Sequence, residues 1–229
     1  SPAGLLRRTG RVPVIAAPAI APGGKTTEEK APPDDEEQPW RKGRAGTSIG
    51  RAVHAVLQTV KLEGGEGLED AASSQAVAEG VPAEAARIAK LSRNALQSRP
   101  VQEAIAAGRG RYWREVYVGT RIEGVTVEGF IDLLYEGADG LVVVDYKTDS
   151  ARSEADIDRA LERYRLQGAA YAVAVEHALG RPVEAVWFVF TEPQIERAVE
   201  ELDRWKQAVK ELIPRIAAGE MVEATPPGA

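Results

Sequence analysis

Hydrophobic positions recur at helical spacing through the first part of the patterned region. Thr47 or Ser48 can cap a helix that runs to about Val60 and carries its apolar residues on one face. A glycine-rich loop, GGEG, comes next. Two further helices fit residues 68–79 and 82–98, and a short helix follows them. This part of the chain is therefore predicted to be helical.

The pattern then changes to the alternating and continuous apolar runs that are typical of strands. The stretches YWREVYVGTRI (112–122) and VTVEGFIDLLYE (125–136) are separated by the short connection EG, which favours a hairpin. The turn GADG leads into a third strand, LVVVDYK (141–147). We expect these three consecutive strands to be antiparallel neighbours.

Helical and strand patterns alternate in the last third of the chain. Residues 156–179 are predicted to form a helix that ends at Gly180, and PVEAVWFVFTE is predicted to be a fourth, buried strand. A long final helix is predicted over residues 196–218, stopped by Gly219. The predicted fold class is α/β, with a mixed central sheet that contains three consecutive antiparallel strands and is flanked by helices.

The two ends of the chain differ in composition from the middle. Residues 1–45 are rich in Pro, Gly, Ala and acidic residues, which is typical of a flexible linker. Residues 11–16 (RVPVIA) could form a short strand, although Pro13 weakens that prediction. We expect a linker over 1–45 that follows another domain of a longer protein, a folded domain over 46–219 and a loose tail over 220–229.

Composition narrows the possible chemistry. The chain has no cysteine, so disulfides, zinc–cysteine sites and iron–sulfur clusters held by this chain are excluded. It contains no apolar run of membrane-spanning length, no signal-peptide pattern and no GxxxxGK[ST] phosphate-binding motif, and a cytoplasmic location is the default expectation. Residues 81–121 hold eight basic and three acidic residues within a chain of net charge −6. This basic zone is either a phosphate-contacting surface or a solvated helix face.

The third predicted strand ends in a charged pair that is costly to desolvate. Asp145 and Lys147 are two residues apart, so their side chains leave the strand on the same face. The preceding hairpin strand can bring Asp132 beside Asp145. Two close carboxylates favour a hard cation such as Mg²⁺ or Mn²⁺, and a nearby lysine can orient or deprotonate a water molecule. The alternative is that these are ordinary charges at the end of a strand.

Four other residues are candidates for the same site, each with a structural alternative. His54 lies on the first helix and is either a metal ligand or a structural histidine. Glu115, inside a strand, is either close to the site or simply faces solvent. Gln167 and Tyr171 share a helix face, which could belong to the site or could place Tyr171 in the core with Gln167 incidental.

Five motifs occur in one order: G(x₇)H, a lone Glu, GxxD, DYKT and QxxxY. Their order resembles the RecB-type branch of the PD-(D/E)XK nuclease superfamily, and the motifs span residues 46–171, over half of the chain. Within that branch, the chain is most similar to the C-terminal nuclease domain of AddA/RecB-like helicase–nucleases with a UvrD-type motor. The resemblance implies a restriction-endonuclease-like core.

The resemblance also implies roles for individual residues. His54, Asp132 and Asp145 would bind the metal together with the main-chain carbonyl of Tyr146. Lys147 would be the catalytic lysine, acting with the two aspartates. The implied cofactor is Mg²⁺ or Mn²⁺. No iron–sulfur cluster is expected, because the cysteines that hold one in AddB-type relatives are missing here.

Three further residues complete the implied site. Gln167 and Tyr171 would bind DNA, with Tyr171 or Trp113 as a surface on which a base could stack, and Glu115 would lie near the site in a role that the resemblance leaves open. The implied function is metal-dependent DNA hydrolysis by the exonuclease module of a helicase–nuclease in double-strand-break repair and recombination. The implied partners are single-stranded DNA, a UvrD-type helicase domain in the same protein and a second helicase–nuclease subunit, with no membrane.

Two other functions are compatible with the same motifs. One is a catalytically silent domain that binds DNA or scaffolds a helicase subunit, although Asp132, Asp145 and Lys147 are all retained. The other is a free-standing restriction-type or junction-resolving endonuclease. The combination of the His54 motif with QxxxY, and the linker-like start of the chain, argue against it.

Overall fold

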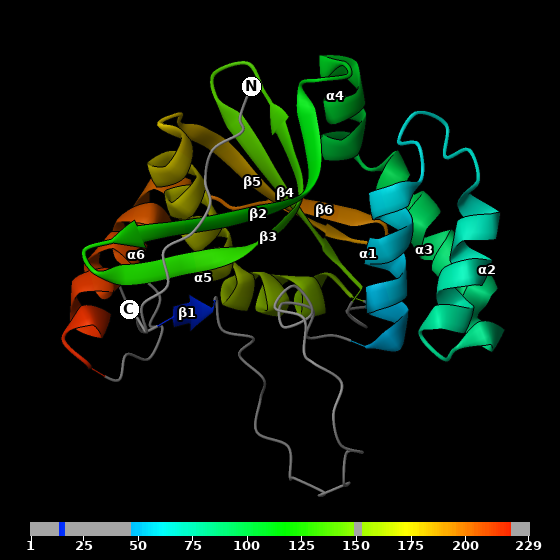
Figure 1. Ribbon diagram of the computed structural model, residues 1–229, viewed down its shortest axis with the longest axis horizontal. Coiled ribbons are helices and arrows are strands. Elements are labelled where there is room, and N and C mark those ends of the chain that lie inside the picture. Colours follow the sequence, from blue (N-terminus) through cyan, green and yellow to red (C-terminus); the bar gives the residue numbers. More distant parts are fainter. Residues whose placement is uncertain (1–13, 17–46, 149–152, 221–229) are drawn as a thin grey trace, which may run out of the picture.

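The computed structural model describes residues 14–16, 47–148 and 153–220. Helices pack on both faces of one mixed sheet (Figure 1). The helices are α1 (Ser48–Thr59), α2 (Leu68–Ala78), a 3-10 turn at Pro82–Glu84, α3 (Ala85–Gln97), α4 (Arg99–Ala107), α5 (Glu154–Leu179) and α6 (Leu202–Ala217). The strands are β1 (Val14–Ala16), β2 (Tyr112–Ile122), β3 (Val125–Glu136), β4 (Leu141–Lys147), β5 (Val183–Phe190) and β6 (Ile195–Ala198).

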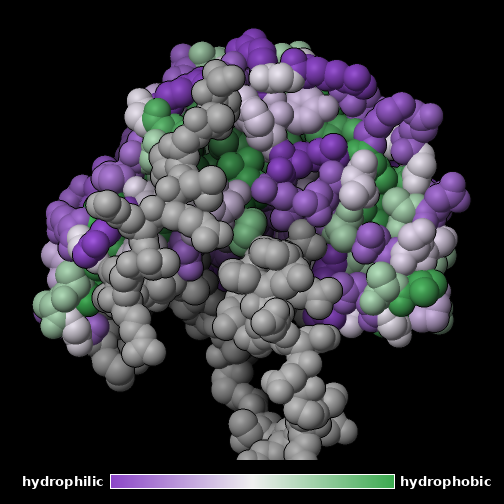
Figure 2. Space-filling model, viewed as in Figure 1, coloured by the Kyte–Doolittle hydropathy of each residue, from purple (hydrophilic) through white to green (hydrophobic). Residues whose placement is uncertain are grey.

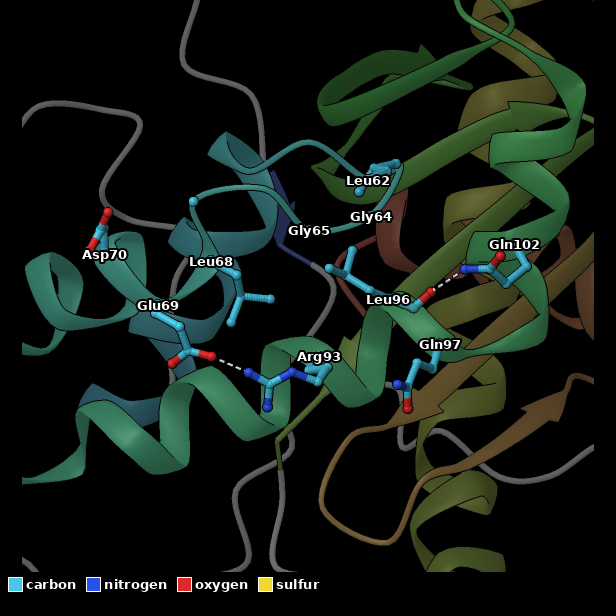
Figure 3. A pocket seen from close by; sticks show the side chains of 11 residues that line it. Leu62, Gly64, Gly65, Leu68, Glu69, Asp70, Arg93, Leu96, Gln97 and Gln102 are labelled. Atoms are coloured by element: carbon cyan, nitrogen blue, oxygen red, sulfur yellow. Dashed lines mark hydrogen bonds and ion pairs between the residues drawn. The ribbon is translucent and has the colours of Figure 1, made fainter.

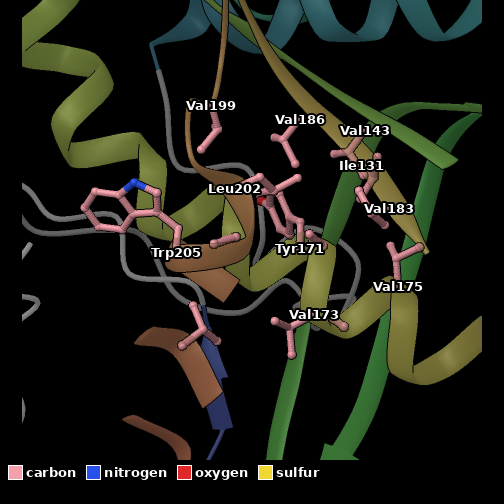
Figure 4. Close-up of a cluster of buried hydrophobic side chains, with 14 of the residues drawn as sticks. Ile131, Val143, Tyr171, Val173, Val175, Val183, Val186, Val199, Leu202 and Trp205 are labelled. Atoms are coloured by element: carbon pink, nitrogen blue, oxygen red, sulfur yellow. The ribbon is translucent and has the colours of Figure 1, made fainter. Parts of the chain in front are cut away.

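The sheet separates two hydrophobic cores. Alternation along β4 sends Leu141 and Val143 toward α5 and α6, and sends Val142, Val144 and Tyr146 toward α1–α4. Figure 4 shows part of the core on the α5–α6 side. Because β4 is covered on both faces, its run of apolar residues is nearly unbroken until the strand reaches Asp145.

The sheet order is β1-β3-β4-β5-β6, and β2 pairs with the other edge of β3. The three strands predicted to be antiparallel neighbours are confirmed, and β5 runs parallel to β4. One edge of β3 is shared by two strands: β4 pairs with residues 133–136 and β1 with residues 126–128. Among the described residues, 129–132 therefore have no strand partner on that edge.

The prediction of one helix over residues 196–218 is wrong at its start. Ile195–Ala198 instead forms β6, which pairs antiparallel with β5 after a turn, and α6 begins only at Leu202. The main-chain hydrogen bonds that residues 195–198 gain at the sheet edge outweigh their helical pattern, and Glu201, with φ of 51°, separates the two elements.

Other boundaries agree with the predictions or differ by a few residues. Thr47 caps α1, accepting a hydrogen bond from the Gly50 amide, as predicted. Helix α5 begins two residues before the predicted position because Ser153 and Asp156 form a capping box. The weakly predicted strand is present as β1, directly after Pro13.

The predicted linker, apart from β1, and residues 221–229 of the predicted tail lie outside the described residues. Within the described part of the chain, no helix combines the length and apolar character needed to cross a membrane.

Candidate active site

The predicted site residues meet where β3 and β4 diverge. Asp145 and Lys147 lie at the end of β4, Asp132 lies on β3, Glu115 on β2 and His54 on α1. In Figure 2, hydrophilic side chains gather at the centre of the face between the β2–β3 hairpin and α1. Four separate elements therefore supply the site, and none of them alone carries enough groups to bind a cation.

Asp132 occupies the gap in the sheet. Leu133 and Val144 form the last pair of the β3–β4 ladder on this side, and one step further the strands separate. There the Tyr146 amide donates to Asp132 Oδ2 at 2.7 Å, while Asp132 Oδ1 lies 2.8 Å from Nδ1 of His54. One carboxylate thus replaces the missing ladder bond and also ties the sheet to α1.

Glu115 faces Asp132 across the hairpin. The flanking pairs Arg114–Leu133 and Val116–Ile131 bracket these two residues. Glu115 has a φ of 51°, an unfavourable conformation for a non-glycine residue, and such strain is concentrated at functional sites. His54, Glu115 and Asp132 each offer a ligand atom, and these atoms lie within 4.8 Å of one another.

This donor set differs in part from the predicted one. Two carboxylates and an imidazole suit a divalent cation that prefers oxygen and nitrogen ligands. The compact group contains Glu115 and does not contain Asp145. Asp145 Oδ2 is buried and is paired with Lys147 Nζ at 2.7 Å, so in this structure Asp145 contacts the lysine and lies outside the compact group.

The charges around His54 alter its protonation. Burial alone would lower the pKa of the imidazole, but Asp132, followed by Asp145 and Glu115, raises the pKa to about 9. Without a cation, the imidazolium therefore balances the carboxylates at neutral pH. A cation that binds His54 must displace a proton.

Lys147 is held by three neighbours. Its Nζ lies 2.7 Å from Asp145 Oδ2, donates to Gln167 Oε1 at 3.2 Å, and sits 4.0 Å from the ring centroid of Tyr164. Asp145 is only 6% exposed, and burial raises the pKa of its carboxyl while the Lys147 charge opposes the shift. The ammonium is therefore fixed above the end of β4.

Gln167 and Tyr171 share one face of α5, as predicted. The Gln167 amide donates to the Tyr171 hydroxyl at 3.0 Å, so Gln167 links Tyr171 to Lys147. Tyr171 is 8% exposed, and its ring packs on Gly129, where an added Cβ would lie 2.6 Å from the ring. The ring of Tyr171 is therefore not available for stacking, and the GxxD motif has a glycine because this ring needs the space.

Two residues that position the site were not predicted from the sequence. Tyr164 precedes Gln167 by three positions and Tyr171 by seven, so its helical spacing was a usable signal. Arg114 donates to the carbonyls of Leu57 (2.9 Å) and Val60 (2.5 Å) at the end of α1, which fixes α1 against β2. No sequence signal indicated that contact.

The predicted basic zone is largely neutralised. Five of its eight basic residues form ion pairs with glutamates: Arg87–Glu192, Arg93–Glu69, Arg99–Glu103, Arg109–Glu63 and Arg111–Glu136. A pocket of about 490 Å³ lies in this region, between the glycine-rich loop and α3, and the pair of Arg93 with Glu69 lines it (Figure 3). None of the predicted site residues lines this pocket, and the ion pairs favour the solvated-surface interpretation of the zone.

The fold and site define an α/β domain with paired carboxylates and a lysine at the end of a central strand. The family model of the PD-(D/E)XK nuclease superfamily matches residues 27–227, so the chain belongs to that superfamily. The resemblance predicted from the five motifs is confirmed, as is the predicted fold class.

Curated relatives are named as subunits of an ATP-dependent helicase/nuclease. The protein of Thermoanaerobacter sp. (strain X514) is 28% identical over 63% of this chain, and that of Desulforudis audaxviator is 32% identical over 62%. The matched part spans 13% of the length of each relative. A solved structure from Eubacterium rectale gives a TM-score of 0.46 at 15% identity over 78% of this chain and 70% of that one, which is too distant to support an argument.

Proposed function

We propose that this chain is a divalent-metal-dependent deoxyribonuclease, the exonuclease module of a helicase–nuclease that acts in double-strand-break repair and recombination. The observation that carries the proposal is the convergence of His54, Glu115 and Asp132 within 4.8 Å, beside the ion pair of Asp145 and Lys147. The relatives named as ATP-dependent helicase/nuclease subunits support the assignment.

His54, Asp132 and Asp145 would hold a Mg²⁺ or Mn²⁺ ion together with the Tyr146 carbonyl, and Glu115 is well placed to join them. When bound, such an ion makes water acidic enough to attack and neutralises charge on the phosphate. The residues of the chain position the attacking water and stabilise the charge of the transition state. Lys147, held by Asp145 and Gln167, orients the attacking water or takes its proton, and its charge stabilises the phosphorane-like transition state.

The partners follow from the same proposal. Single-stranded DNA would be the substrate, and a UvrD-type motor in the same polypeptide, together with a second subunit, would deliver it. Residues 46–219 would be the nuclease domain, with residues 1–45 as its tether and the cytoplasm as its location. Water would attack the phosphate in line, and the 3′ oxygen of the sugar would be the leaving group.

The test is cleavage of end-labelled single-stranded and duplex DNA in Mg²⁺, Mn²⁺ and Ca²⁺. We expect cleavage of single strands in Mg²⁺ or Mn²⁺, and its loss in Lys147→Ala with metal binding retained. Lys90→Ala, a change at an exposed lysine remote from the site in sequence, is the matched control and should behave as wild type. Wild-type rates in Lys147→Ala would refute the role of this lysine. Binding in Ca²⁺ without cleavage in Mg²⁺ or Mn²⁺, repeated with the full-length protein, would instead indicate a silent domain.

A further inference from the structure

An aromatic pair, one exposed ring and one half-buried ring, lies on the β2–β3 hairpin, close to the candidate active site. Tyr117 is 55% exposed although it lies in the middle of a strand. Its ring centroid is 5.3 Å from that of Phe130, its cross-strand neighbour, with 54° between the ring planes. We call Tyr117 and Phe130 the aromatic shelf. Only Val118 of β2 is buried, and the exposed ring of Tyr117 contacts the half-buried ring of Phe130, so the two rings form one aromatic surface on the hairpin.

Tyr117 is fixed in one orientation. Its hydroxyl donates to Glu128 Oε2 at 2.7 Å. The ring also lies over Gly119, where an added Cβ would be 2.7 Å from the hydroxyl oxygen and 3.0 Å from the ring carbons. Glycine at position 119 therefore provides the space in which the ring lies along the strand. A ring that is already immobilised loses little conformational entropy when a ligand stacks on it.

The aromatic shelf faces the same side of the sheet as α1. Val116 and Val118 pack into the core on the α5–α6 side, so Tyr117 between them points to the opposite face. Before Glu115, the even-numbered residues of β2 face the α1–α4 side instead, since Tyr112 packs against the core on that side. The faces of β2 therefore exchange at Glu115. In Figure 1 the hairpin extends away from α1, so helices α1–α4 do not reach over its outer half.

The aromatic shelf is also continuous with the site. Tyr117 is two residues from Glu115, about 7 Å along an extended strand, and Phe130 is two residues before Asp132. Arg121 follows on the same face of β2, is exposed, and forms no ion pair with another described residue. The surface therefore presents a positive charge at Arg121, the carboxylate of Glu128 that Tyr117 binds, the aromatic face, and then the candidate metal ligands.

We propose that the aromatic shelf stacks a nucleobase of the DNA strand next to the phosphate that is cleaved, with Arg121 contacting a phosphate further along. The proposal rests on the proposed nuclease function and adds a substrate-binding site to it. Every base has a π face, so stacking on Tyr117 would hold a single strand without selecting its sequence. A base paired inside a duplex could not reach the ring, so the shelf would also favour single strands.

The test is a double-mutant cycle between the protein and the DNA. Binding of labelled single-stranded oligonucleotides is measured in Ca²⁺, with one abasic position moved along the strand. We expect Tyr117→Ala to weaken binding of the intact strand about tenfold. We expect one abasic position to weaken binding to the wild type by a similar factor, and to have no further effect on Tyr117→Ala.

Two variants serve as controls. Tyr117→Phe keeps the ring and should bind nearly as wild type does. Trp113→Ala removes another exposed aromatic residue of β2, one that faces the opposite side of the sheet, and should show no coupling to any abasic position. Two results would overturn the proposal. One is an unchanged affinity in Tyr117→Ala. The other is that, at every abasic position, the loss of affinity in Tyr117→Ala multiplies with the loss caused by the missing base, so that the two changes act independently.

Refutation of the aromatic shelf can be separated from failure of the proposed nuclease function. The binding cycle needs no cleavage, so it tests the aromatic shelf even in a silent domain. If the wild type cleaves in Mg²⁺ but the cycle shows no coupling, the shelf alone is refuted. Because Tyr117 is exposed, we expect the melting temperature of Tyr117→Ala to match that of wild type. A matching melting temperature would exclude misfolding as the cause of weaker binding.

Discussion

Replacing Tyr164 by leucine removes the aromatic face on which the Lys147 ammonium rests. The Nζ atom lies 4.0 Å from the Tyr164 ring centroid and 5.3 Å from that of Phe188, and the lysine side chain is 12% exposed. In such a desolvated setting a cation–π contact is worth about 1–2 kcal/mol. If the contact holds the lysine in its reactive position, its loss should lower the chemical rate about fivefold to thirtyfold.

The matched variant is Tyr164→Phe, which keeps the ring and removes only the hydroxyl. Single-turnover cleavage with saturating enzyme in Mg²⁺ measures the chemical step, and binding in Ca²⁺ measures affinity for the strand. We expect Tyr164→Leu to reduce the single-turnover rate with little change in affinity, and Tyr164→Phe to stay close to wild type. Because the Tyr164 ring also packs against Phe188 at 5.5 Å, thermal unfolding must be measured for both variants.

Two results would refute the reasoning. An unimpaired single-turnover rate in folded Tyr164→Leu would mean that Asp145 and Gln167 suffice to place the ammonium. An equal loss in Tyr164→Phe and Tyr164→Leu would assign the effect to the hydroxyl and not to the ring face.

Four other predictions concern protons, metal binding and packing. The pKa of His54 is raised from 6.5 to about 9. In the metal-free protein the protonated imidazole therefore contributes its full stabilisation below pH 6.5, and this stabilisation is lost as the pH rises through 9. Thermal unfolding measured against pH should show this loss. The proton also competes with the metal, so Mn²⁺ affinity by calorimetry should rise about tenfold per pH unit from pH 7 to 8, a slope that His54→Gln should flatten. Gly129→Ala should cost about 1–3 kcal/mol in urea unfolding because its Cβ meets Tyr171, and a stability within error of wild type would contradict the close packing. Lys206→Met should cost about 1–3 kcal/mol by leaving Glu176 without its 2.8 Å partner, with nuclease activity retained below the melting temperature.

Much of the fold could be predicted because its signals are local. The strands β2, β3 and β4 have apolar patterns bounded by short turns, and their order predicted that Asp132 would lie near Asp145, one step beyond the last ladder pair, Leu133–Val144. Segment 195–198 could not be assigned in this way. Its residues fit a helix, and only pairing with β5, a tertiary interaction, selects the strand.

The sequence could predict which residues of the candidate site lie near one another, but it could not predict their geometry. The motifs identified His54, Asp132 and Lys147, since each is spaced from its neighbours in a recognisable pattern. The positive φ of Glu115 depends on how β2 changes faces beside α1, and no feature of the residue itself indicates it. The neutralisation of the basic zone likewise depends on glutamates far away in sequence, such as Glu192 beside Arg87.

The carboxylate that bridges the gap between β3 and β4 has an evolutionary consequence. Asp132 accepts the Tyr146 amide and holds α1 through His54, so alanine there would leave a main-chain donor unsatisfied as well as remove a ligand. Selection for folding alone would keep Asp132 in a descendant that had lost its chemistry. Lys147 also has a structural role, because its charge partners the buried carboxylate of Asp145. Among homologues, a retained aspartate at this position is therefore not by itself evidence of catalytic activity.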